Sequence, residues 1–423
     1  MSVRVEAKPS TPSKQEPDAP RGRPAWRRVW DILLIPILAV FSALVIGALF
    51  IAFTDAEVYA AFREGFGRGL AAAWRSVAVA YGAMFAGSIG SPREVVSALQ
   101  AYFASGATEP LILAFNPLSE SLVASTPYIF AGLAVAVGFR GGLFNIGGEG
   151  QLWVAAGAAV VIGYSFLLPW WLHLPFAIAG GILAGAIYGA IPGYLKAKTG
   201  AHEVINTIMM NYIAFRFFDW AFTGILRRPG GDRPITAEIL PTAYLPRLFP
   251  DPMRFHVGFF LALLAAFAVW WLLFKTTIGF EIRTVGTNPD AARYGGIKVT
   301  RIFVLTMFIS GGLAGMTGVN EVLGVNRYLA GGFSAGYGFD AIALALLGKS
   351  HPLGVVLASL LFGTLRNGAT RMQSIAQIPI DIISIVQALI IVFIAAPALV
   401  RWIYRVKAET DLGEAVFTRG WGS

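Results

Sequence analysis

The fold is decided by RGGLFNIGGEGQ at residues 140–151 and by AGGFSAGYGFDA at residues 330–341. Each glycine-rich stretch interrupts a long apolar run and leads into a new one. In lipid, every backbone N–H and C=O group needs a partner, so a spanning helix breaks only where protein or a water-filled path accepts its hydrogen bonds. Breaks at corresponding places in two halves of a chain point to a translocation path. The pair of stretches therefore predicts a polytopic membrane transporter.

The composition places the chain in a membrane. Of 423 residues, 56% are hydrophobic and 13% charged, and the mean hydropathy is +0.65. A soluble globule of this size would need more charge on its surface. The net charge of +9 could indicate nucleic-acid binding, but Lys and Arg lie in short segments between apolar runs. We therefore interpret them as topology signals and expect no nucleic-acid partner.

Neither a metal site nor a catalytic site is predicted. The absence of cysteine excludes disulfides, Cys-ligated zinc and thiol nucleophiles, and leaves the redox compartment undecided. The 4 histidines, at positions 173, 202, 256 and 351, lie far apart in the sequence. No GxxxxGK[ST] phosphate loop occurs, so we expect no nucleotide site in this chain.

The apolar segments predict an all-α polytopic protein with about ten membrane crossings. A helix needs ~20 residues to span the hydrocarbon core. One segment, 340–348, is too short unless an unwound lead-in completes it. The predicted segments lie near 31–53, 119–139, 150–168, 173–195, 203–226, 256–274, 302–324, 340–348, 352–370 and 378–400.

An even number of crossings puts both tails on one side. The positive-inside bias then places the basic, disordered tail 1–30 and the tail 401–423 in the cytoplasm, flanking a permease domain at 31–400. The basic loop 275–301 agrees with this orientation. The arginines at 227–255 disagree with it.

Residues 56–118 are expected to form an external, partly helical insert. Within it, 69–90 is apolar enough to suggest a further span, but Arg75 lies inside that stretch. A charge at a helix centre costs ~2.5–3.5 kcal/mol on insertion scales. The spanning alternative stays open from sequence.

The two glycine-rich breaks predict halves of inverted topology, at about 119–224 and 302–400. In the ten-crossing scheme the first break follows an inward helix and the second an outward helix. Two unrelated glycine-rich loops are the alternative.

The loop 275–301 contains a signal for a short capped helix. Asn288 suits the N-cap, Pro289 the first helical position, and Asp290 complements the helix dipole. Gly295 and Gly296 would end the helix. We expect a compact docking element, with an ordinary interhelical turn as the alternative.

Polar residues inside apolar segments are costly and are therefore candidates for function. Each also has a purely structural interpretation. Glu149 and Asp340 could be structural locks, that is, side chains that hold broken helices in place, and Glu203 could form an ion pair with Lys196 or Lys198. The amides could form interhelical hydrogen bonds. Arg371 and Asp381 could pair across an external turn. The candidates for the translocation path or the broken helices are Asn145, Glu149, Glu203, Asn206, Asn211 and Asp340.

Four stretches resemble the permease subunits of bacterial ABC importers of the nucleoside and simple-sugar type, in the group that includes ribose and branched-chain amino acid permeases. They are GLFNIGGEGQLWVAAGAAV (142–160), KAKTGAHEVINTIMMNYIA (196–214), VGTNPDAARYGGIKV (285–299) and GFDAIALALLG (338–348). The resemblance covers about 119–400, and the insert 56–118 departs from it.

The resemblance implies a multi-pass transport subunit, not an enzyme, in the bacterial cytoplasmic (inner) membrane. ATP and Mg would bind to a separate ABC ATPase. The other implied partners are a second, paralogous permease in a heterodimer, an external substrate-binding lipoprotein, membrane lipid and a small polar solute. The ATPase-coupling residues implied are Asn288, Pro289, Asp290, Ala291, Arg293, Tyr294 and Gly295.

The leading hypothesis is a nucleoside importer subunit. A monosaccharide such as ribose is the alternative substrate. An ion-coupled secondary transporter, which would need a titrating Glu149 or Asp340, is the alternative from another class.

Overall fold

The computed structural model describes residues 25–230 and 233–406, and these residues form an all-α bundle as predicted. Between them they contain only two isolated β-bridges, Ile235 with Ala330 and Arg247 with His256. The α-helices are α1 Ala25–Thr54, α2 Ala56–Glu64, α3 Phe66–Ile89, α4 Pro92–Ser105, α5 Glu109–Arg140, α6 Gly148–Ser165, α7 Trp170–Thr199, α8 Glu203–Thr223, α9 Gly258–Lys275, α10 Thr277–Thr287, α11 Pro289–Tyr294, α12 Val299–Asn320, α13 Tyr337–Leu347, α14 Pro352–Ala376, α15 Asp381–Ala395 and α16 Pro397–Tyr404. A π-helical turn, Glu321–Asn326, extends α12, and a 3-10 turn lies at Pro241–Ala243.

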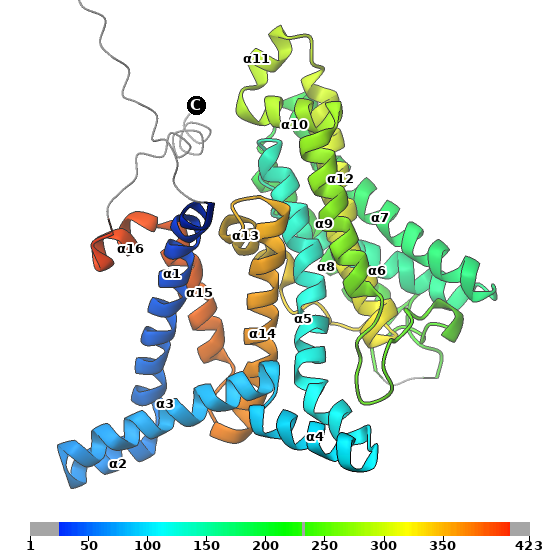
Figure 1. Cartoon of the computed structure of the whole chain (residues 1–423). Coiled ribbons are helices and arrows are strands. Elements are labelled where there is room, and N and C mark those ends of the chain that lie inside the picture. The colour runs from blue at the N-terminus through cyan, green and yellow to red at the C-terminus, as the bar shows by residue number, and fades with distance from the viewer. Residues whose placement is uncertain (1–24, 231–232, 407–423) are drawn as a thin grey trace, which may run out of the picture.

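The long helices run between two ends of the molecule (Figure 1). We call them the α11 end, from which α10 and α11 project, and the α4 end, where α2, α3 and α4 lie. Helix α1 begins towards the α11 end, and α16 lies on that side as well. The tail 1–24 lies outside the described residues, as does 407–423.

Among the described residues, six helices are long and apolar enough to span a membrane. They are α1 (from Leu34), α5, α7, α9, α12 with its π-helical extension, and α14. A seventh span would be α15 with α16, which are bent by 89° at a break. The predicted single segment 378–400 is therefore wrong at its end, because Pro397 lacks the N–H that would continue the helix. The count of ten crossings stays a prediction.

The two glycine-rich breaks are entered in opposite directions. Helix α5 runs towards the α11 end before the first break, whereas α12 runs away from that end before the second (Figure 1). Helices α6 and α13 then start within the bundle, where Gly148 and Gly338 approach each other. This is the arrangement that inverted halves require.

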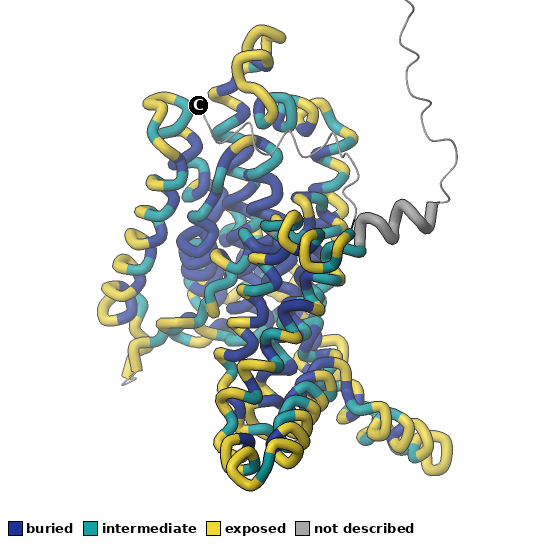
Figure 2. The backbone as a smooth tube through the Cα atoms, turned by 90° about the vertical axis from the view of Figure 1, so that its left-hand side faces the viewer, coloured by how far each residue is buried: buried dark blue, intermediate teal, exposed yellow. Residues whose placement is uncertain are grey.

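Helix α5 is the centre of the bundle. In its most apolar window 83% of the residues are buried, against 28% in α9. Figure 2 shows buried residues gathered in the middle of the bundle and exposed ones at its ends. In a membrane, a helix with this much buried surface faces other helices, and one like α9 faces lipid as well.

Helices α7 and α12 pack through glycines. A Cβ atom added to Gly185 would lie 2.7 Å from the Gly311 carbonyl oxygen, and one added to Gly189 would lie 2.8 Å from Gly311 Cα. Small residues at every fourth position let two backbones approach closely, which is how helices associate where no hydrophobic effect drives them together. We did not predict this contact from the sequence.

The insert lies at the α4 end and is mostly helical. Helix α3, which contains the ambiguous stretch 69–90, crosses the ends of α1 and α14 rather than running parallel to the long helices (Figure 1). It is not among the helices apolar enough to span. The pair of Arg371 with Asp381, considered as one possibility, is not formed: Arg371 instead lies 3.3 Å from the Glu94 carboxylate of α4, because the insert covers that end of α14.

Candidate functional site

Helix α11 forms a capped protrusion with the residues predicted for it. The Asn288 side chain accepts hydrogen bonds from the backbone N–H groups of Asp290 and Ala291, each at 3.0 Å. The helix ends at Gly295, as expected. Because Asn288 supplies an acceptor and Pro289 removes a donor, the first turn forms from local sequence alone.

The protrusion presents polar and aromatic groups outward. Tyr294 is 98% exposed, and Arg293 pairs with Asp290 at 2.8 Å on the surface. Ala292 is buried in the same apolar cluster as Ile282 and Val299, so the inner side of the turn packs on the bundle. An exposed aromatic ring and a charge pair on a projecting helix are suited to contact another protein.

A buried carboxylate joins the two breaks. Glu149, in the first turn of α6, accepts hydrogen bonds from the Gly338 backbone N–H at 2.7 Å and from the Ser334 hydroxyl. Both donors belong to the second glycine-rich stretch, and Glu149 is only 3% exposed. Glu149 therefore connects the start of α6 to the start of α13, which is the structural lock considered from sequence.

Two asparagines hold the unwound segment before α6. Asn145 is fully buried and its Nδ2 donates to Ser310 Oγ at 2.8 Å and to Gln151 Oε1 at 2.9 Å. Asn211 of α8 accepts from the Gly150 N–H at 2.7 Å and donates to the Ile146 carbonyl at 2.9 Å. Asn145 Oδ1 also accepts from the Gly147 N–H at 3.0 Å, so both side chains satisfy backbone groups that a broken helix leaves free.

The other two candidates on α8 are not part of this junction. Glu203 forms an ion pair with Lys196 at 2.9 Å, which is the structural alternative for this residue. Asn206 is half-buried, and its Nδ2 has no hydrogen-bond partner among the described residues. Of the three candidates on α8, Asn211 thus holds the unwound segment, Glu203 is ion-paired, and the Nδ2 group of Asn206 is unpaired.

Asp340 lies in a cluster that the sequence did not reveal. Its Oδ2 accepts a hydrogen bond from the Tyr128 hydroxyl of α5 at 3.0 Å, and Arg366 of α14 lies close enough to interact with both. The Tyr337 ring packs edge-on against Tyr128 with centroids 5.0 Å apart. Two tyrosines in apolar helices give no signal in sequence, because aromatic residues also face lipid or fill a core.

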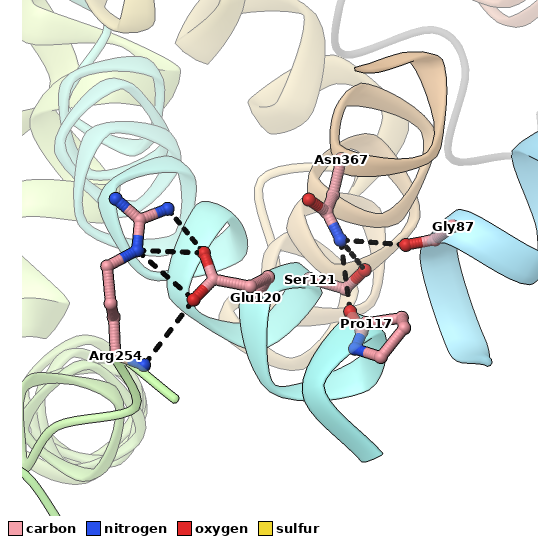
Figure 3. Close-up of polar contacts among 6 residues, drawn as sticks. All are labelled: Gly87, Pro117, Glu120, Ser121, Arg254 and Asn367. Carbon is pink, nitrogen blue, oxygen red and sulfur yellow. Dashed lines mark hydrogen bonds and ion pairs between the residues drawn. The ribbon is translucent and has the colours of Figure 1, made fainter. Parts of the chain in front are cut away.

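Figure 3 shows how α5 is held on both sides near the α4 end. Both carboxylate oxygens of Glu120 accept hydrogen bonds from the guanidinium group of Arg254, which lies in the segment between α8 and α9. On the other side, Asn367 Nδ2 lies 3.0 Å from the Ser121 hydroxyl and from the carbonyls of Gly87 and Pro117. The arginine-rich loop 227–255 therefore contributes to packing at this end.

The sequence comparisons identify the family. Residues 118–395 match the family described as branched-chain amino acid transport system / permease component. The chain belongs to this family. It is an ABC importer permease of the nucleoside and simple-sugar type. The match begins after the insert, so α2, α3 and α4 lie outside it.

Several curated proteins are similar over most of their length. The chain is 44% identical to a guanosine ABC transporter permease protein of Bacillus subtilis over 68% of this chain and 83% of that protein. It is 33% identical to a nucleoside ABC transporter permease protein of Lactococcus lactis, over 72% and 85% respectively. A glucose ABC transporter permease protein of Haloferax volcanii is 33% identical over 66% and 75%. No solved structure matches the chain.

Proposed function

We propose that this permease carries a nucleoside into a bacterial cell across the cytoplasmic membrane, with energy supplied by a separate ATPase at α11. The exposed, capped α11 is the observation that carries the proposal. The two bacterial relatives named for guanosine and nucleoside transport support this substrate class. The alternative is a monosaccharide, which relatives named for glucose and D-allose favour.

The proposal assigns α11 as the coupling helix, with Asn288 to Gly295 as its contact residues. The cap makes the helix rigid without support from the partner, and Tyr294 and Arg293 are free to enter a cleft. ATP and Mg would bind to the ATPase, because the chain contains no phosphate-binding loop. In this orientation the α11 end lies in the cytoplasm, with the start of α1 and helix α16 on the same side. We propose on this basis that both tails are cytoplasmic.

The translocation path in this proposal runs along the junction of the broken helices. Asn145, Glu149 and Asn211 keep the backbone open there, and the cluster of Asp340, Tyr128 and Arg366 offers donors and acceptors to a passing solute. Ten crossings would need four more besides the six spanning helices: α8, α15 with α16, and α6 and α13 with their unwound lead-ins.

Ion coupling through Glu149 is less well supported than ATP coupling. Both donors to this carboxylate come from the second break, so its geometry serves the connection between α6 and α13. The family match also assigns the chain to ATP-driven importers.

A second permease would complete the conduit. Bacillus subtilis has two guanosine ABC transporter permease proteins similar to this chain, at 44% and 30% identity, and Lactococcus lactis has two nucleoside permease proteins at 33% and 28%. Such pairs favour a heterodimer of paralogues. An external substrate-binding lipoprotein would deliver the solute at the α4 end.

The experiment measures uptake of labelled nucleosides and monosaccharides by cells that express the whole transporter, with wild-type permease or with Arg293→Ala/Tyr294→Ala. We expect nucleoside uptake to fall roughly 10-fold in the variant, as for the loss of an interface hot spot. The amount of permease in the membrane should not change, since both side chains are exposed. Phe103→Ala, at an 82% exposed position of α4, is the control. Uptake of monosaccharides alone would refute the assignment of a nucleoside as the substrate. Unchanged nucleoside uptake in the variant would refute the coupling role of α11.

A further inference from the structure

An open groove of about 930 Å³ lies at the α11 end, between the C-terminal end of α7 and the N-terminal end of α12. Its cationic lining residues are Lys198, Arg293, Lys298 and Arg301. Its apolar lining includes Val304, Leu305 and Phe308. No carboxylate lines it, so the groove concentrates positive charge.

Three of the four cationic side chains in the groove have no carboxylate partner among the described residues. In the described part of the chain, no carboxylate lies within ion-pair distance of Lys198, Lys298 or Arg301. Arg293 is paired, but only with Asp290 on the surface of α11. Like charges gathered without counter-ions repel one another, so an anion bound among them would be stabilised.

Charge and apolar surface are separated along the groove. Arg301, Leu305 and Phe308 follow one another at helical spacing on one face of α12. At 1.5 Å per residue, Phe308 lies about 10 Å deeper along the helix than Arg301. The cations therefore surround the mouth, and the apolar side chains line the part that points towards the middle of the bundle.

We infer that this groove binds an anionic phospholipid. The phosphate group would lie among Lys198, Lys298 and Arg301, and an acyl chain would lie against Val304, Leu305 and Phe308. Basic pockets between membrane helices bind acidic headgroups in this way. An acidic segment of a protein would satisfy the cations, but it would leave the apolar depth of the groove without a partner.

The inference goes beyond the proposed function and uses different residues. It assigns the groove to lipid and leaves α11 to the ATPase, so a lipid molecule would occupy the position beside the coupling helix. Only Arg293 belongs to both sites, and for this reason it is left unchanged in the test.

The test compares lipid retention by the complete transporter with wild-type permease and with Lys198→Gln/Lys298→Gln/Arg301→Gln. Each complex is purified, incubated with dioleoyl phosphatidylglycerol, dioleoyl phosphatidylcholine or glycerol 3-phosphate, and analysed by native mass spectrometry. We expect the dissociation constant for phosphatidylglycerol to rise roughly fivefold for each cation removed, and on the order of 100-fold for all three. Phosphatidylcholine and glycerol 3-phosphate should bind weakly to both proteins.

The matched control removes the same charge at the α4 end, with Arg63→Gln/Arg68→Gln/Arg93→Gln. All three arginines are exposed, and the control should retain phosphatidylglycerol as the wild type does. Equal retention by the groove variant and the wild type would overturn the inference. So would tight binding of glycerol 3-phosphate, which would indicate a phosphate site without a lipid.

Arg301→Cys gives a second measurement, because the wild-type chain has no cysteine. High-yield cross-linking from this position to the ATPase or to the second permease would show that protein covers the groove, and would also overturn the inference. A cysteine that cross-links to neither protein, but reacts with a thiol-reactive phosphatidylglycerol, would support it.

Discussion

Glu149 and Gly338 are 189 positions apart in the chain, yet the carboxylate of one accepts a hydrogen bond from the backbone N–H of the other at 2.7 Å. This contact joins the first turns of α6 and α13, the two helices that begin inside the bundle. The contact gives the Gly338 N–H, in the first turn of α13, an acceptor from the other break, as a buried backbone group in a membrane protein requires.

Replacing Glu149 with alanine should destabilise the folded protein by ~2–4 kcal/mol. The change leaves the buried Gly338 N–H and the half-buried Ser334 hydroxyl without an acceptor. Thermal unfolding of the purified protein measures the effect. Glu149→Gln keeps one acceptor oxygen, so it should lose less stability and retain transport. A Gln variant that folds normally but transports nothing would instead favour ion coupling through this carboxylate.

Asn211 and Asn206 offer a matched pair on one helix. Asn211→Leu removes hydrogen bonds to Gly150 and Ile146 and should cost ~2–4 kcal/mol. Asn206→Leu should be neutral or slightly stabilising, because the Nδ2 group of Asn206 is buried without a partner. Unfolding curves of both variants against wild type test the prediction. Equal effects would show that the buried bonds of Asn211 contribute nothing.

Gly185→Ala should separate α7 from α12 and cost ~1–3 kcal/mol. The added Cβ would meet the Gly311 carbonyl, which is backbone and cannot rotate away. Gly331→Ala is the control, because a Cβ there would have no neighbour within 4 Å. The unfolding temperatures of the two variants give the comparison, and an equal, small loss in both would contradict close glycine packing.

His256 should make the folded protein acid-sensitive. Burial, with Arg327, Arg247 and Arg254 nearby, lowers the pKa of His256 to about 4. An unfolded chain binds a proton at this residue below about pH 6.5, and the folded chain only below about pH 4. Stability should therefore fall as the pH decreases from about 6.5 to about 4, by at most about 3 kcal/mol.

Unfolding temperatures between pH 7 and pH 4.5 measure this dependence. His256→Asn can still accept the hydrogen bond that His256 Nδ1 accepts from the Gly258 N–H. It cannot titrate in this range, so its unfolding temperature should vary less with pH than that of the wild type. Parallel curves for the two proteins would assign the acid sensitivity to other groups.

The Asn288 cap can be tested separately from the contacts of α11. Asn288→Ala removes two hydrogen bonds to the first turn and should cost ~1 kcal/mol locally. Asn288→Ser keeps a capping oxygen, so the α11 amides should be protected from hydrogen exchange as in the wild type. Hydrogen exchange of the amides of Ala291 to Tyr294 reports the difference, and identical exchange in both variants would show that the cap does not hold the helix.

Features that depend on residues close together in the chain could be predicted from the amino-acid sequence. The cap of α11 was predicted residue by residue, because Asn, Pro and Gly act on a backbone only a few positions away. The breaks at 140–151 and 330–341 and the membrane class were predicted for the same reason, since length and apolarity are local properties.

Contacts between residues far apart in the chain became known from the packing of the helices. From sequence, the partners of Glu149 and Glu203 were open, and only the packing of α6 on the second break and of α8 beside α7 shows which protein groups they meet. The approach of Gly185 to Gly311 and the meeting of Tyr128 with Asp340 have no local signal at all. The physical reason is that a hydrogen bond or a close backbone contact is set by distance in space, which sequence spacing does not encode once a chain crosses a membrane several times.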